Sequence, residues 1–127
     1  MGNIILKKQL QFAAFALFAL NLMVALPLLA QGDPMCTGDM TTVASLKDCV
    51  QHAYAMGHID NKGVAKSLLK KLDAVQAAVS RGQDDVAINN LDAFINAVKA
   101  QSGKHIAAEH AAHMIHHAEM VIDALSG

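Results

Sequence analysis

Apolar residues recur at helical spacing from residue 41 to the end of the chain, in four stretches that glycines and polar turns separate. Within each stretch they fall on one face, at i, i+3, i+4 and i+7 positions, and alternating patterns typical of strands are scarce. The short connections favour antiparallel neighbours. The pattern therefore predicts an all-α fold, a small antiparallel bundle of three to four helices after an N-terminal hydrophobic segment.

The ends of the expected helices follow from residues that cap helices. Asn61 and Asp84 are the expected N-caps of the second and third helices, and Gly103 is expected to cap the end of the third. The expected buried stripes include Tyr54 on the first helix and Val86 on the third. The helices are expected to run from Thr41 or Thr42 to Gly57, from Asn61 to Gly82, from Asp84 to Gly103 and from Ile106 to Leu125.

The chain begins with an apolar segment of the kind that directs export. Residues 10–30 carry no charge, follow two lysines and consist almost wholly of Leu, Ala, Phe, Val and Met. Small residues at 30–32, just after Pro27, favour cleavage by a signal peptidase, so residues 1–32 are assigned to a signal peptide. About 20 apolar residues can also span a bilayer, so a retained membrane anchor is the alternative. Either way, the rest of the protein is expected in the periplasm or outside the cell.

Removal of the leader leaves roughly 95 residues, which is enough for one small domain and too few for a large catalytic fold. The remaining part has 8 Lys and Arg residues against 11 Asp and Glu residues, and no basic run. A net negative charge makes nucleic acid an improbable partner. The absence of Trp and the single Tyr argue against stacking platforms for bases or sugars.

Cys36 and Cys49 are expected to form a disulfide, because thiols that reach an oxidising compartment tend to pair. Neither cysteine belongs to a Cys-x-x-Cys redox pair or a haem-attachment motif. The predicted organisation is a signal peptide at 1–32, a disulfide-stapled extension with the first helix at 33–57, and a helical domain at 58–127.

The stretch from Gly57 to Ile122 resembles the FIMAH-type domain, a small helical module appended to various secreted bacterial proteins. The long segment from residue 91 to residue 106 is the most specific part of the resemblance. The matching segments are Ile59–Val64, Leu68–Asp73, Arg81–Gly82, Leu91–Ile106 and Ala111–Ile122.

The resemblance implies an accessory module without catalytic residues. The first interpretation is therefore a non-catalytic exported adaptor without a cofactor, which acts by contact with an extracytoplasmic protein or a cell-envelope component. A homo-oligomer is compatible with this interpretation, and contact with the membrane is expected only if the leader is retained. The first helix with its cysteines, and the histidines described next, have no counterpart in the resemblance.

Five of the seven histidines lie within thirteen residues, on or just before the last expected helix. At 100° per residue, His110, His113 and His117 lie within about 60° of one another, and His113 and His117 form an i, i+4 pair that can hold one cation. This face is expected to lie beside the apolar stripe with little overlap. The alternative function is therefore binding of Zn or Cu, ions that imidazole ligands suit.

Further soft or acidic ligands lie near this face, and the first helix carries a similar pair, His52 and Met56. The competing interpretation is that the histidines are solvated and only titrate between about pH 5 and 8. His105 is expected to be a turn residue. The candidate metal ligands are His110, His113, His117, Glu109, His116 and Met120.

Other chemistry is weakly indicated. Asp60, Asn61 and Gly63 match only part of a calcium loop, and N-capping by Asn61 explains them better. The Ala-rich helices lack the large apolar residues that a haem pocket requires. The sequence also lacks a nucleophile elbow and a phosphate-binding glycine loop. No catalytic residues are predicted.

Overall fold

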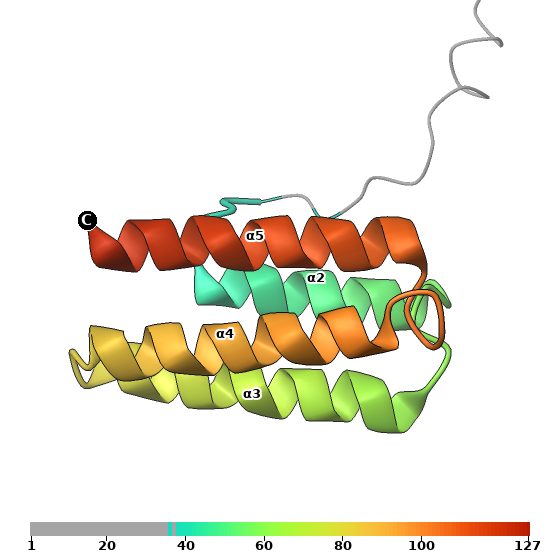
Figure 1. Ribbon diagram of the computed structural model, residues 1–127, viewed down its shortest axis with the longest axis horizontal. Coiled ribbons are helices and arrows are strands. Elements are labelled where there is room, and N and C mark those ends of the chain that lie inside the picture. Colours follow the sequence, from blue (N-terminus) through green and yellow to red (C-terminus); the bar gives the residue numbers. More distant parts are fainter. Residues whose placement is uncertain (1–35, 37) are drawn as a thin grey trace, which may run out of the picture. The chain divides into compact units, whose positions relative to one another are not determined.

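The computed structural model describes residue 36 and residues 38–127, and this part of the chain is an all-α bundle (Figure 1). The predicted signal peptide or anchor at residues 1–32 lies outside the described residues. Within the described part, no helix is both long and apolar enough to cross a membrane. The helices are α2 (Val43–Ala55), α3 (Lys62–Ser80), α4 (Asp84–Gln101) and α5 (Ala108–Ser126).

Consecutive helices run antiparallel and close into a ring (Figure 1). α2 packs against α3, α3 against α4, and α4 against α5, and the ring closes because α5 also packs against α2. The short connections between helices produce this order, as the sequence predicts. We call the contact between α2 (Val43–Ala55) and α5 (Ala108–Ser126) the α2–α5 seam.

Side-chain caps fix the starts of α2 and α3. Asn61 Oδ1 accepts hydrogen bonds from the backbone N–H groups of Gly63, at 2.8 Å, and Val64, at 3.2 Å. Thr42 Oγ1 accepts one from the N–H of Ser45, at 3.2 Å. Both caps satisfy donors of a first helical turn, which have no partner within the helix. The role of Asn61 as an N-cap is confirmed.

The start of α4 differs from the prediction. Its N-cap is Gln83, which makes no capping hydrogen bond with its side chain, and Asp84 is already the first helical residue. The carboxylates of Asp84 and Asp85 therefore lie in the first turn, where they interact favourably with the positive end of the helix dipole. The sequence pattern did not separate these two ways of starting a helix.

The loops before α3 and before α5 are joined at one end of the bundle. Ile59 and Ile106 form a backbone bridge and are each 1% exposed. Asp60 N donates to His105 O at 3.0 Å, and His105 Nδ1 lies 2.7 Å from Asp60 Oδ1. His105 is thus a turn residue, as expected. Ile106 packs in a loop, and α5 begins two residues later than predicted, at Ala108.

The core fills the middle of the ring. Phe94, Leu68 and Leu72 are among its largest buried side chains. Two residues placed in the predicted stripes are exposed instead, Tyr54 by 41% and Val86 by 44%. Ala53, which belonged to the same predicted stripe as Tyr54, is buried as expected, and Ala87 is buried next to the exposed Val86.

Candidate metal centre

The α2–α5 seam gathers the histidines of α5 against α2. His117 is 1% exposed and is the only fully buried polar residue among those that the structure describes. His110 and His113 are half-buried. The prediction that the histidine face lies beside the core with little overlap is therefore wrong for His117, because α2 packs against this side of α5.

Several imidazole nitrogens in the seam are inaccessible to solvent and form no hydrogen bond within the described part of the protein. They are Nδ1 and Nε2 of His117, Nε2 of His113 and Nδ1 of His110. A buried polar atom without a partner costs about 1–3 kcal/mol. The seam therefore gives up stability at these positions, which is more typical of a binding site than of a structural core.

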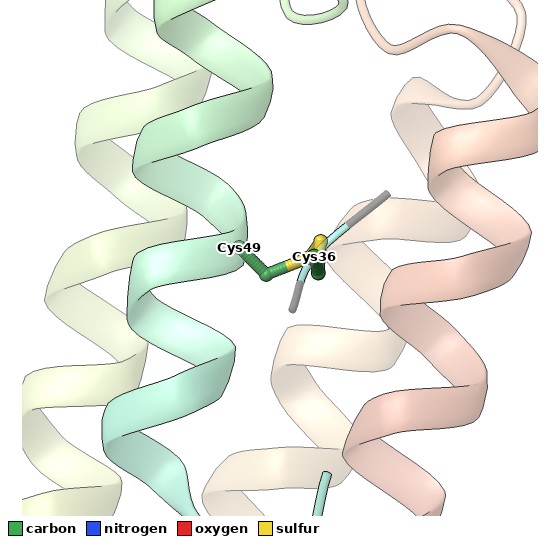
Figure 2. The surroundings of a disulfide bond; sticks show 2 residues. All are labelled: Cys36 and Cys49. Atoms are coloured by element: carbon green, nitrogen blue, oxygen red, sulfur yellow. A yellow bond between two sulfur atoms is a disulfide. The ribbon is translucent and has the colours of Figure 1, made fainter. Parts of the chain in front are cut away.

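A disulfide lies beside these histidines. Cys36 and Cys49 are bonded, with a Cα–Cα distance of 4.9 Å, and the bond ties the segment before α2 to the middle of that helix (Figure 2). The predicted pairing is confirmed. A ring nitrogen of His113 lies within 4.8 Å of both sulfur atoms. A histidine of α5, a cysteine of α2 and a cysteine of the segment before α2 thus meet at one point.

The histidines continue along the seam in both directions. The rings of His113 and His117 meet edge to face, with centroids 6.4 Å apart. At the other end, the rings of His58 and His110 stack with centroids 3.7 Å apart. The helical pattern does not single out His58, because His58 belongs to the loop after α2. Only antiparallel packing of α2 and α5 brings that loop beside the start of α5.

The electrostatics of the seam favour neutral imidazoles. Burial lowers the pKa of His117, His113 lowers it further, and the Asp39 carboxylate opposes the shift. Burial also lowers the pKa of His110, and the neighbouring His58 acts in the same direction. Neutral imidazole is the form that binds metal ions, so protons compete only weakly for these ligands at neutral pH.

Asp39 supplies a carboxylate whose charge reaches His117. Its Oδ1 accepts hydrogen bonds from Thr41 Oγ1, at 2.6 Å, and Thr41 N, at 2.9 Å. These bonds lower the pKa of Asp39, so the group stays ionised at neutral pH. The sequence pattern does not single out Asp39, because only the fold brings its charge within range of His117.

The structure brings together three of the six predicted ligands, His110, His113 and His117. Glu109 and His116 are exposed, and Met120 is half-buried. His52 and Met56, the additional pair on the first helix, are exposed as well. The seam thus combines part of the predicted set with the two cysteines.

We expect the metal-free protein to lose stability as the pH falls below about 6.5, the ordinary pKa of histidine. Because burial lowers the pKa values of His117 and His110 in the folded state, the unfolded state binds protons first. The unfolding free energy is therefore highest at pH values above the histidine pKa of the unfolded state. It declines as the pH falls toward the histidine pKa of the folded state. Urea unfolding between about pH 5.5 and 7.5, with a chelator present, measures this slope. An equal slope in His117→Leu would contradict the assignment to His117.

The fold and the disulfide define a small, stapled, all-α module. Residues 43–123 match the FIMAH domain, and the chain belongs to this family. The match includes α2, so the module is wider than the resemblance at residues 57–122 suggested. Neither a curated protein nor a solved structure matches the chain. The family and the disulfide are both consistent with an exported accessory domain.

Proposed function

We propose that this protein is a non-catalytic accessory domain outside the cytoplasm, and that its α2–α5 seam binds a transition-metal ion, either Zn or Cu. Membership of the FIMAH family supports the accessory role. The disulfide supports an oxidising compartment, the periplasm or the extracellular space. The buried histidines of the seam support the metal-binding role.

The burial of His117 carries the metal proposal. An imidazole that is 1% exposed, with neither nitrogen bonded to a described residue, costs stability unless a ligand uses it. His113 stands one helical turn away, which is the spacing at which two imidazoles share one ion. The charge of the Asp39 carboxylate favours a cation at His117. Imidazole and carboxylate are common ligands of Zn, and imidazole also suits Cu.

Calorimetric titration of the oxidised, metal-stripped protein with Zn(II) and Cu(II) tests this proposal. We expect a dissociation constant below about 1 μM, equivalent to about 8 kcal/mol. His113→Ala and His117→Leu should each weaken binding at least about tenfold, because each removes a ligand. His116→Ala is the matched control, since His116 lies on the same helix but is exposed. Binding that survives the combined change at positions 113 and 117 would refute the site.

Contact with another molecule is the second candidate function, and a lysine cluster on α3 favours it. Lys66, Lys70 and Lys71 line an open groove of about 570 Å³, together with Asn90 of α4. Three lysines in one groove form a positive patch on a module whose net charge is negative. Such a patch suits an acidic protein surface or an anionic envelope component.

Charge reversal tests the contact function. Lys66→Glu combined with Lys70→Glu should reduce co-sedimentation with isolated cell envelopes by at least about fivefold, because the patch loses its sign. Lys99→Glu combined with Lys104→Glu makes the same change of charge away from the groove and should leave sedimentation unchanged. Equal loss in both variants would show that only net charge matters and would remove the groove from consideration.

A further inference from the structure

A histidine and two bonded cysteines meet at one point of the α2–α5 seam. A ring nitrogen of His113 and the sulfur atoms of Cys36 and Cys49 all lie within 4.8 Å of one another. His117 follows one turn later, and neither of its nitrogens bonds to a described residue. The sulfur atoms are joined to each other in this state. Reduction of that bond would place two thiols beside two imidazoles.

We propose that the disulfide is one state of a redox-gated zinc site. When the bond is reduced, the thiolates of Cys36 and Cys49 bind one Zn²⁺ together with His113 and His117. When the thiolates are oxidised, the bond forms again and the ion is released or held only by the histidines. This inference rests on the metal-binding function proposed above, because it uses the same two histidines.

The three residues already grouped, Cys36, Cys49 and His113, can reach the spacing of a tetrahedral ion with small movements. With Zn–S bonds of about 2.3 Å and Zn–N bonds of about 2.0–2.1 Å, neighbouring ligand atoms are about 3.4–3.8 Å apart. The His113 nitrogen, which lies within 4.8 Å of both sulfur atoms, must approach by up to about 1 Å, and reduction must let the two sulfur atoms separate to about 3.8 Å. His117, whose ring centroid lies 6.4 Å from that of His113, must turn toward the same point. The two histidines have the His-x₃-His spacing found in Cys₂His₂ sites, and they belong to one rigid helix.

The chemistry balances if a dithiol acts as the reductant. The dithiol gives two electrons and two protons to the Cys36–Cys49 bond, so the S–S bond breaks, two protein thiols form and the reductant becomes a disulfide. Binding of Zn²⁺ then releases the two thiol protons, because only thiolates are strong ligands. In the reverse direction, a disulfide oxidant accepts two electrons from the thiolates and the protein bond forms again.

The two sulfur atoms differ in access. Cys49 is 2% exposed, whereas Cys36 is half-buried. An incoming thiolate therefore reaches Cys36 more readily and forms a mixed disulfide there, which releases Cys49 as the first free thiol of the seam. Cys49 then lies beside His113, where a metal ion can capture it before the original bond is restored.

Both states keep the segment before α2 attached. A disulfide joins Cys36 to Cys49 directly, and a zinc ion joins the same residues through two Zn–S bonds. Reduction without metal removes both connections. The inference therefore predicts that the reduced, metal-free protein is the least stable of the three forms.

Zinc titration of the oxidised and the reduced protein under anaerobic conditions tests the inference. We expect the reduced protein to bind Zn²⁺ at least about a hundredfold more tightly, because thiolates add two anionic ligands. Co²⁺ should give sulfur-to-metal charge-transfer absorption in the reduced protein only. Zn²⁺ should also protect both thiols from alkylation, a measurement that requires no variant. Reduced His116→Ala is the matched control and should behave as the unsubstituted protein, whereas reduced His113→Ala should bind more weakly.

The outcomes separate this inference from the proposed function. Binding by the oxidised protein without any gain on reduction would overturn the redox-gated site and leave the histidine site intact. Binding by the reduced protein alone, with thiol protection and dependence on His113, would support the thiolate site and overturn the histidine-only site. Absence of binding in both forms would overturn both. Tight binding by the Cys36→Ser/Cys49→Ser variant under the same reducing conditions would likewise exclude the cysteines as ligands.

Discussion

Replacement of both Cys36 and Cys49 by alanine lowers the unfolding free energy of the metal-free protein by about 3 kcal/mol. The disulfide closes a loop between residues 13 positions apart, and opening that loop gives the unfolded chain more conformations. For a domain of this size, the loss corresponds to a fall in melting temperature of about 12–24 °C. A loss of this size is a large share of the stability of a small domain.

Urea unfolding followed by circular dichroism measures this effect. The unsubstituted protein in reductant and chelator is the matched control and should fall by nearly the same amount. Helix content at low temperature should persist in both, because Cys49 is a single member of the buried core and the substitutions leave the core residues of α3, α4 and α5, Phe94 among them, in place. A loss of less than about 1 kcal/mol would indicate that the segment before α2 stays in place without the bond.

His117→Leu raises the unfolding free energy of the metal-free, oxidised protein by about 2 kcal/mol. Leucine has a similar volume and no polar atoms, so the change removes two buried nitrogens that no described residue satisfies. The same change should abolish the rise in melting temperature that Zn²⁺ gives the unsubstituted protein, since ligands stabilise the form that binds them. Higher stability with lost binding is typical of a residue retained for function.

His116→Leu is the control for this prediction. It makes the same substitution one residue earlier, at an exposed position, and should change stability by less than about 0.5 kcal/mol. Melting curves with chelator and with Zn²⁺ provide both comparisons. Destabilisation by His117→Leu would show that the imidazole is satisfied in solution, for instance by water, and that its burial is structural.

The helices could be predicted from the sequence because the signals that define them are local. Asn61 caps α3 through bonds to residues two and three positions ahead. Gly82 and Gly103 follow α3 and α4 with φ of 68° and 73°, a conformation that glycine adopts at little cost. The disulfide was predictable too, since only two cysteines are present and the leader indicates export.

The candidate site was only partly predictable, because its construction depends on contacts between distant segments. Helical spacing placed His110, His113 and His117 on one face, but it did not show that α2 covers that face and buries His117. Asp39 and His58 lie outside the helices, so their places beside α5 follow from packing alone. Local patterns record the direction of a side chain around its helix, and they do not record what packs against it.

The path of the disulfide also determines how the protein carries mechanical load. A pull on the chain before residue 36 enters the bundle at Cys49, in the middle of α2, and bypasses the first turns of that helix. The covalent loop between these residues keeps about 40 Å of chain from extending while the bond is intact. Reduction would release the part of that loop before α2, about 25 Å at most, and transfer the force to Val43 at the start of the helix. The redox state of one bond thus sets how far the protein stretches before its core begins to open.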